Sequence, residues 1–265
     1  MSRMCDMKVS VITVVFNAVG RIDRTIRSVL NQTYPNIEYI VVDGGSTDGT
    51  VDLISQYKGQ IAYFVSERDR GLYDAMNKGV VAATGDWIGV MNAGDVYASS
   101  EILSKVFSDE NGYDGIDVIY GNSRAVDGDS VVEYVGGKNI DELVLYPIYR
   151  HGASFVRRST HLKYLFDLSK VEMLGFALDY YCIYSMYRAG CKFRKVDVMI
   201  MEFEKEGLSN SACKSLYYNY LITHDLRFGL IEKLAFIRLL LIFTIKNSII
   251  GKMIRWVKRR RLRYA

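Results

Sequence analysis

The sequence predicts an α/β protein built on a mostly parallel sheet with helices on its faces. In the N-terminal part of the chain, four short apolar segments alternate with segments whose apolar residues recur at helical spacing. Polar residues follow each apolar segment, at the edge where parallel sheets bind their ligands. Hydrophobic residues make up 49% of the 265 residues, which is ample for a core and inconsistent with disorder.

The predicted elements follow from this alternation in chain order. The first strand is KVSVITVV, and apolar residues from Ile22 to Leu30 then recur at helical spacing. The second strand, IEYIVV, ends at Asp43 and precedes the turn GGSTDGT and a short helix. A further helix is expected over residues 72–83, between the third and fourth strands. The four expected strands span residues 8–15, 37–42, 61–65 and 87–91.

The pattern changes after residue 110. Residues 118–124 and 130–135 flank the turn VDGD and predict a hairpin. A strand is then expected over residues 192–203 and a helix over residues 215–228. With no repeat and only two prolines, the sequence predicts one catalytic domain over residues 1–228 and a helical tail over residues 229–265.

Charge and cysteine usage exclude some classes of protein. The net charge is +4, but residues 246–265 hold eight basic residues and no acid, which leaves 26 basic against 30 acidic residues elsewhere. A nucleic-acid-binding body is therefore not expected. The four cysteines have no metal-binding spacing and indicate reduced thiols in a cytosolic protein. The N-terminal stretch lacks a signal-peptide pattern, and the longest apolar run, residues 239–243, is too short to span a bilayer.

The tail predicts an amphipathic helix. Apolar residues such as Ile250, Ile254 and Trp256 fall on one half of a helical wheel, and Lys252, Arg255 and neighbouring polar residues fall on the other. This pattern favours a helix lying on an anionic membrane surface. The alternative is a helix packed on the core with a solvated basic end.

The run MNAGD, residues 91–95, follows the fourth strand and carries the most informative acid. Asp95 could leave the sheet edge and hold Mg²⁺ or Mn²⁺ against a diphosphate, because such ions take few carboxylates and complete their shell with phosphates and water. An ordinary turn is the alternative, since Asn, Gly and Asp are turn residues. No GxGxxG, GxxxxGKS or GxSxG motif occurs.

The order of motifs resembles glycosyltransferase family 2. The segments VSVITVVFNAVGRIDRTIRSVLNQTYPNIEYIVVDGGSTDGT and SERDRGLYDAMNKGVVAATGDWIGVMNAGD carry the resemblance, which covers roughly residues 8–210. It looks closest to bacterial enzymes that build O-antigen and other surface polysaccharides. The resemblance implies the GT-A fold, a Rossmann-like nucleotide-binding mixed sheet flanked by helices.

Carried over residue by residue, the resemblance implies a donor site. Asp43 matches the acid that recognises uracil in users of UDP-sugars, although an Asp that caps its own turn is the alternative. Asp95 matches the metal ligand, and Asp48 is as much a candidate helix cap as a ligand. The other implied nucleotide- or donor-binding residues are Thr13, Asn17, Asp69, Arg70, Asn77 and Asn92.

The resemblance also implies an acceptor side. Asp179 in LDYY matches the catalytic base, which would take the proton of the acceptor hydroxyl; its alternative is an Asp interacting with a helix dipole. His151 in HGASFVRRS matches an acceptor-side segment, although a lone His is more often structural. Gly207 and Ser209 match a mobile loop that closes over both substrates.

Two residues depart from the family pattern. Gly94 stands where the family usually has another carboxylate, so metal binding would depend on Asp95, diphosphate oxygens and water. Met76 stands where many members have an arginine, and Arg70 is a candidate for supplying that charge.

The sequence as a whole therefore predicts an inverting, metal-dependent glycosyltransferase. Its expected donor is a UDP-sugar and its expected acceptor is an undecaprenyl-diphosphate-linked glycan, in polysaccharide or O-antigen biosynthesis. The expected location is peripheral, on the cytoplasmic face of the inner membrane. The alternative is a non-catalytic nucleotide-sugar-binding subunit of a polysaccharide assembly complex, supported by Gly94. A soluble nucleotidyltransferase is a third possibility, but it would need neither Asp179 nor the tail.

Overall fold

The computed structural model describes residues 7–107, 112–127, 130–204, 212–226, 229, 234, 236–238 and 241. The chain divides into two compact units, residues 1–210 and 211–265. The first unit holds the sheet, and the second holds the helix α8 (Ala212–Thr223). The domain boundary expected after residue 228 stays a prediction, and the basic tail, residues 246–265, lies outside the described residues.

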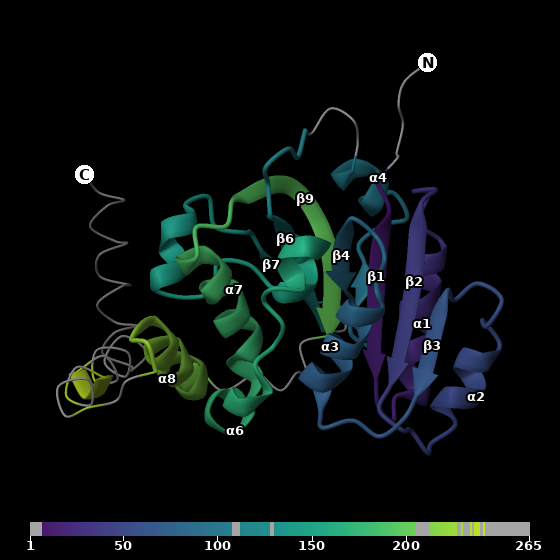
Figure 1. Ribbon diagram of the computed structural model, residues 1–265, viewed down its shortest axis with the longest axis horizontal. Coiled ribbons are helices and arrows are strands. Elements are labelled where there is room, and N and C mark those ends of the chain that lie inside the picture. The colour runs from purple at the N-terminus through teal and green to yellow at the C-terminus, as the bar shows by residue number, and fades with distance from the viewer. Residues whose placement is uncertain are drawn as a thin grey trace. The chain divides into compact units, whose positions relative to one another are not determined.

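Within the described residues, nine strands form one mixed sheet in the first unit (Figure 1). They are β1 (Val9–Val15), β2 (Ile37–Asp43), β3 (Tyr63–Ser66), β4 (Trp87–Val90), β5 (Val96–Tyr97), β6 (Val118–Asp127), β7 (Ser130–Tyr134), β8 (Ser154–Arg157) and β9 (Phe193–Glu204). Their order across the sheet is β3-β2-β1-β4-β8-β6-β9-β5, and β7 pairs with β6. The predicted α/β fold class and mixed sheet are therefore confirmed.

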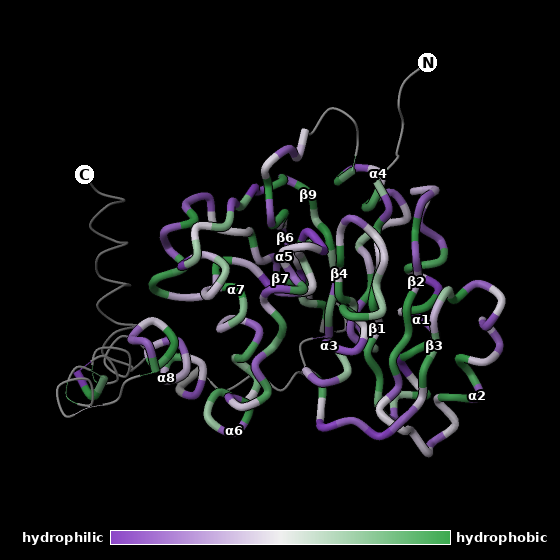
Figure 2. Tube along the Cα trace, in the orientation of Figure 1, coloured by the Kyte–Doolittle hydropathy of each residue, from purple (hydrophilic) through white to green (hydrophobic). Residues whose placement is uncertain are grey.

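The four strands expected from the N-terminal pattern form the parallel half of the sheet. β1 pairs with β2 on one side and with β4 on the other, and β2 pairs with β3. Every residue of β1 is buried, which explains why five of its seven residues are valine or isoleucine (Figure 2). Because the strands are parallel, the loops that follow β1, β2, β3 and β4 meet at one edge of the sheet.

Helices cover both faces of this parallel half. They are α1 (Val19–Leu30), α2 (Thr50–Ser55) and α3 (Leu72–Ala82). Ile22, Ile26 and Val29 of α1 share a core with Val9 and Val11 of β1. On the other face, α3 approaches so closely that a Cβ at Gly79 would lie 2.4 Å from Cγ2 of Ile12. An alanine at residue 79 would therefore push α3 away from β1.

The second half of the sheet is mostly antiparallel. The predicted hairpin is confirmed, because β6 and β7 pair antiparallel around the turn. The strand expected over residues 192–203 is confirmed as β9, which pairs parallel with β6. β5 and β8 were not predicted. β5 is too short to show a period, and β8 is inserted between β4 and β6, a position set by the tertiary fold.

Short helices and turns connect the strands of this half. They are α4 (Ile102–Val106), η2 (Ile140–Val144), η3 (His151–Ala153), α5 (Arg158–His161), η4 (Leu168–Lys170), α6 (Val171–Leu174), η5 (Gly175–Ala177) and α7 (Leu178–Arg188). The helix α8 lies three to five residues earlier than the expected span 215–228. Throughout the described residues, every helix is too short or too polar to cross a lipid bilayer.

Candidate active site

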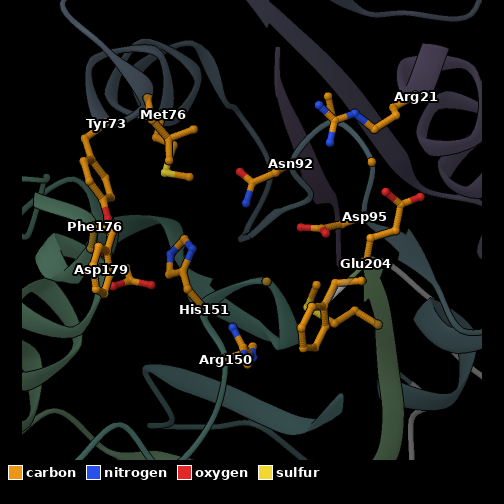
Figure 3. Close-up of a pocket in the computed structure, with 16 residues that line it drawn as sticks. Arg21, Tyr73, Met76, Asn92, Asp95, Arg150, His151, Phe176, Asp179 and Glu204 are labelled. Carbon is orange, nitrogen blue, oxygen red and sulfur yellow. Dashed lines mark hydrogen bonds between the residues drawn. The ribbon is translucent and has the colours of Figure 1, made fainter. Parts of the chain in front are cut away.

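A cavity with a volume of about 700 Å³ lies against the loop that follows β4 (Figure 3). It is lined by Arg21 of α1, by Leu72, Tyr73 and Met76 of α3, by residues 92–95 and 150–152, by Phe176 of η5, by Asp179 at the start of α7, and by Met201, Phe203 and Glu204 of β9. Figure 3 shows Asp95 and Asp179 on opposite sides of the cavity, with Arg150 and His151 between them. Two acids 84 residues apart in the sequence therefore face one space.

The loop that carries Asp95 is fixed by helix α1. The Thr25 hydroxyl donates to the backbone carbonyl of Asp95 over 2.8 Å and accepts the N–H of Gly94 over 2.9 Å. Gly94 has a φ of +105°, a conformation that glycine adopts without strain. A Cβ at Gly94 would lie 3.6 Å from Cδ of Arg21. The family's missing carboxylate would therefore have stood beside this arginine.

The surroundings of Asp95 disfavour the charged form of its carboxyl group. Burial raises the pKa of Asp95 to about 7, despite opposing effects from a hydrogen bond with Asn92 and from the charges of Arg150 and Arg24. The carboxylate is therefore costly to ionise without a compensating cation. A divalent cation at this point would restore the charged form.

The residues around Asp95 fit a hard divalent cation. Oδ1 of Asn92 is buried and has no hydrogen-bond partner among the described residues. With the Asp95 carboxylate it offers oxygen donors of the type that Mg²⁺ and Mn²⁺ prefer. No cluster of three or more His, Cys, Asp or Glu side chains occurs in the part of the chain that the structure describes. A cation here would therefore depend on substrate oxygens and water for most of its ligands.

Asp179 lies in the first turn of α7 and is half-buried. Burial raises the pKa of Asp179 to about 6, although the N–H of Tyr180 and the charge of Arg150 oppose the shift. The Tyr180 N–H donates to Oδ1 of Asp179 over 2.7 Å. A carboxyl group with a pKa near neutrality and an opening to a cavity is suited to accept a proton.

His151 lies between the two acids and is uncharged. Burial lowers the pKa of His151 to about 3 and that of the neighbouring His161 to about 4. Their rings meet edge to face at 6.5 Å, and both pack against Phe166. His151 can therefore donate or accept a hydrogen bond in the cavity, but it cannot serve as a cation.

Asp43 lies at the end of β2 with no exposed surface and does not line the cavity. Its Oδ2 accepts from the N–H groups of Gly45 and Ser46 and from the Ser66 hydroxyl, and its Oδ1 accepts from the Ser46 hydroxyl. These contacts fit the turn-capping alternative. Because a carboxylate has about four lone-pair sites, Oδ1 retains room for one more donor. Uracil recognition by Asp43 stays a prediction.

Asn17 and Asp48 stabilise the same edge of the sheet. Asn17 accepts the N–H of Thr47 over 2.9 Å through its side chain, and its φ is +45°. Asp48 accepts the N–H groups of Val19 and Thr50, so it connects the first turns of α1 and α2. These contacts assign Asp48 a structural role, while Asn17 remains exposed at the loop where a nucleotide was expected.

Two expected donor-binding residues make contacts inside the fold, and their roles in donor binding stay predictions. Thr13 is fully buried in β1, and its hydroxyl accepts from Tyr39 over 3.0 Å. Asn77 uses both ends of its amide on the backbone of Phe166, over 2.8 and 2.9 Å. Both side chains hold the fold together, and neither lines the cavity.

The remaining predictions have mixed outcomes. Asp69 approaches the second strand's loop so closely that a Cβ at Gly44 would lie 2.5 Å from its carboxylate, but it does not line the cavity. Arg70 forms an ion pair with Asp74 over 2.8 Å and is largely exposed, so it does not supply the expected charge to the cavity. Gly207 and Ser209 lie outside the described residues.

Sequence reasoning missed the cations of the cavity. Arg21 and Arg150 line it, and Glu204 lies at its edge in an ion pair with Arg24 over 2.5 Å. Arg150 directly precedes the predicted residue His151, which is the signal that could have drawn attention to it. Arg21 follows the expected nucleotide loop by one helical turn. Neither position is part of a motif that marks an anion-binding site.

The comparisons with known proteins identify the class of this fold and site. Residues 10–164 match the model of the family described as glycosyl transferase family 2. Since this match covers more than half of the chain, the protein belongs to glycosyl transferase family 2. The family resemblance predicted from the motifs is confirmed.

Individual relatives and solved structures are similar to this chain at low to moderate sequence identity. The chain is 37% identical over 114 residues to an uncharacterized glycosyltransferase of Mycobacterium tuberculosis. The aligned segment covers 43% of this chain and 44% of the relative. The chain thus spans about half the length of such relatives. Its fold is similar to that of S. aureus TarS 1–349 in complex with UDP-GlcNAc, with a TM-score of 0.65, 18% identity, and coverage of 91% of this chain and 74% of the other.

A second solved structure has a similar fold. It is the mannosyltransferase PcManGT from Pyrobaculum calidifontis in complex with GDP-Man and Mn²⁺, with a TM-score of 0.60 and 16% identity. The match covers 98% of this chain and 81% of the other. These structural similarities confirm the predicted GT-A fold.

Proposed function

We propose that the protein is an inverting, metal-dependent glycosyltransferase that transfers a sugar from a UDP-sugar to a hydroxyl group of a lipid-linked glycan. The observation that carries this proposal is the cavity with Asp95 on one side and Asp179 on the other. An acid beside a cation and diphosphate, opposite an acid that accepts a proton, is the arrangement that sugar transfer with inversion requires. The intervening space accommodates the sugar.

The transfer proceeds in a single displacement. The acceptor hydroxyl gives its proton to the Asp179 carboxylate, and its oxygen forms a bond to the anomeric carbon. The bond between that carbon and the diphosphate oxygen breaks, and the electron pair stays on the diphosphate. Because the attacking oxygen and the leaving diphosphate lie on opposite faces of the sugar, the configuration at the anomeric carbon inverts.

Asp95 and Asn92 are the residues that would hold the cation. When bound, Mn²⁺ or Mg²⁺ supplies charge neutralisation to the leaving diphosphate. The buried, unpartnered Oδ1 of Asn92 and the raised pKa of Asp95 support this assignment. The Mn²⁺ in the PcManGT complex is consistent with it. The non-catalytic alternative depends on Gly94 alone, whereas Asp95 and Asp179 share a cavity and favour an enzyme.

The choice of a uridine nucleotide is tested by comparing two nucleoside diphosphates. UDP should bind at least tenfold tighter than GDP in the presence of Mn²⁺, because a buried acceptor that loses its hydrogen-bond donor costs ~1–3 kcal/mol. Calorimetric titration measures both affinities. Asp43→Asn, which keeps the shape but loses an acceptor, should reduce this preference. Equal affinities of the wild-type protein for UDP and GDP would remove the uracil assignment. Turnover of UDP- and GDP-sugar panels with a prenyl-diphosphate-linked acceptor tests the transferase activity itself.

The acceptor proposal rests on the composition of the tail. Residues 246–265 combine eight cations with an apolar face and Trp256. Such a helix would keep the protein at the cytoplasmic face of the inner membrane, where an undecaprenyl-diphosphate-linked glycan presents its terminal sugar. Polysaccharide or O-antigen biosynthesis is the role that suits such an acceptor.

Removing residues 246–265 should abolish most binding to anionic vesicles while leaving the proposed catalytic residues in place. Each cation near an anionic surface contributes roughly 1 kcal/mol, and salt screens only this electrostatic part. The truncated protein should still glycosylate a short, water-soluble acceptor analogue. A flotation assay measures the binding, with neutral vesicles as the control. Equal flotation of the full-length and truncated proteins would contradict membrane attachment through the tail.

A further inference from the structure

Arg150 differs from the other charged residues of the cavity in how it is held. Its guanidinium lies 4.2 Å from the ring centroid of Phe203 and 5.1 Å from that of Tyr134. The two rings lie 5.7 Å apart and are tilted by 37°. Arg150 thus lies over two neighbouring aromatic rings, one from β9 and one from β7, and aromatic rings attract a cation without neutralising it.

These aromatic contacts leave the positive charge of Arg150 available to a ligand. Among the described residues, no carboxylate lies within ion-pair distance of it, whereas Glu204 is paired with Arg24 and Arg124 with Glu202. A guanidinium has five N–H donors in a planar fork that matches the oxygens of a phosphate. An unpaired, pre-positioned arginine that lines a cavity is therefore a candidate anion-binding group.

The position of Arg150 indicates which anion it meets. Figure 3 shows it between Asp95 and Asp179, and its charge acts on both carboxylates. In the proposed reaction, the bond that breaks lies between the diphosphate, on the Asp95 side, and the sugar, on the Asp179 side. The oxygen that receives negative charge when this bond breaks therefore lies in the region that Arg150 faces.

The composition of the loop after β4 explains why a positively charged side chain such as that of Arg150 is needed in the cavity. With Gly94 in place of a second acid, Asp95 is the one carboxylate within residues 91–95. A metal site with fewer carboxylates binds its divalent ion less firmly. More of the negative charge of the diphosphate must then be neutralised by side chains of the protein. Arg150 supplies a permanent positive charge for this purpose.

We propose that Arg150 binds the β-phosphate of the donor and stabilises the departing diphosphate, so that it is a substrate-binding residue of the transfer reaction. This inference rests on the proposed function. The guanidinium donates hydrogen bonds to the leaving oxygen as the bond to the anomeric carbon breaks, and it exchanges no proton itself. The same chemistry could be offered by the diphosphate of a lipid-linked acceptor, and the experiment distinguishes these two sources.

The test compares Arg150→Met, which keeps an unbranched apolar side chain against the two rings, with Arg150→Lys, which keeps the charge. Calorimetry with Mn²⁺ should show that Arg150→Met weakens UDP binding by about 10- to 100-fold, because charge-assisted hydrogen bonds to phosphate are lost. Binding of UMP, which has no β-phosphate, should change by less than about twofold. Arg150→Lys should bind UDP with intermediate affinity, because a point charge does not reproduce the planar fork.

Arg188→Gln is the matched control. Arg188 also lies over an aromatic ring, that of Tyr184 at 5.9 Å, but on the exposed side of α7 and outside the cavity. Its UDP affinity and turnover should equal those of the wild-type protein. Thermal unfolding of each variant with and without UDP provides a second measure of binding that requires no acceptor.

Three outcomes would overturn the inference. If Arg150→Met and Arg150→Lys bind UDP as the wild-type protein does, Arg150 does not contact the β-phosphate. If only the KM for a diphosphate-linked acceptor rises, the anion belongs to the acceptor. If the wild-type protein itself binds neither UDP, GDP nor inorganic diphosphate, the proposed function fails together with the inference. The first two outcomes overturn only the inference and leave the proposed function intact.

Discussion

Replacing Asp179 with asparagine is expected to lower turnover by about 10²–10⁴-fold, because the amide keeps the shape of the side chain but cannot accept the acceptor's proton. UDP binding should change little, since Asp179 lies on the side of the cavity opposite Asp95. Glu172→Gln, an exposed acid on α6, is the control and should keep wild-type activity. Single-turnover kinetics with a water-soluble acceptor measure the chemical step, and calorimetry measures donor binding.

The pH dependence of the wild-type enzyme gives a second measure of the same role. Burial raises the pKa of Asp179 to about 6, so the base is protonated and inactive below that pH and active above it. The kcat/KM profile should therefore lose activity as pH falls through about 6. Asp95, whose pKa burial raises to about 7, contributes its own loss of activity at low pH through Mn²⁺ binding, so the residual activity of Asp179→Asn should lack only the limb near pH 6. Near-normal activity of Asp179→Asn, or a product with retained anomeric configuration by NMR, would contradict the assignment.

The parallel half of the fold was predictable because its signals are local. Buried parallel strands such as β1 read as apolar runs, and α1 shows a helical period that matches its buried residues. The antiparallel strands β5 and β8 were not predictable in the same way. Their positions depend on pairing with β9 and with β4 and β6, which are distant in the sequence.

The candidate site was predictable to the extent that its residues follow motifs. Asp95, Asp179, Asn92 and His151 were found in this way, and all four line the cavity. Thr13 and Asn77 also belong to the motifs, but they do not line this cavity. A residue within a motif can turn its side chain toward the core, as Thr13 does, or toward a neighbouring backbone, as Asn77 does.

Arg150 was missed because its environment is assembled from distant strands. Its aromatic contacts come from Tyr134 of β7 and Phe203 of β9, and neither ring belongs to a recognisable motif. An arginine next to a candidate histidine has no distinctive sequence spacing. Its availability to an anion follows only from the arrangement of these three elements around one cavity.

Asp95→Ala is expected to lower transfer by about 10²–10³-fold or more, the range seen when one group that stabilises transition-state charge is removed. The fold should remain intact, because the backbone of the loop is held by Thr25 through main-chain atoms of Gly94 and Asp95. Asp52→Asn, an exposed acid in the first turn of α2, is the control and should retain activity. EDTA should inactivate the wild-type enzyme and Mn²⁺ should restore it.

Binding of Mn²⁺ provides a measure of Asp95 that does not depend on turnover. Electron paramagnetic resonance should show weak Mn²⁺ binding to the protein alone and at least tenfold tighter binding with UDP, because the diphosphate contributes ligands that Asp95 and Asn92 cannot. Burial raises the pKa of Asp95 to about 7, and a carboxyl group must lose its proton to bind a cation. Mn²⁺ affinity in the presence of UDP should therefore increase as pH rises through about 7, and Asp95→Asn should lack this dependence. If EDTA leaves wild-type turnover unchanged and UDP does not strengthen Mn²⁺ binding, Asp95 is not a metal ligand, and neutralisation of the diphosphate must come from the arginines of the cavity.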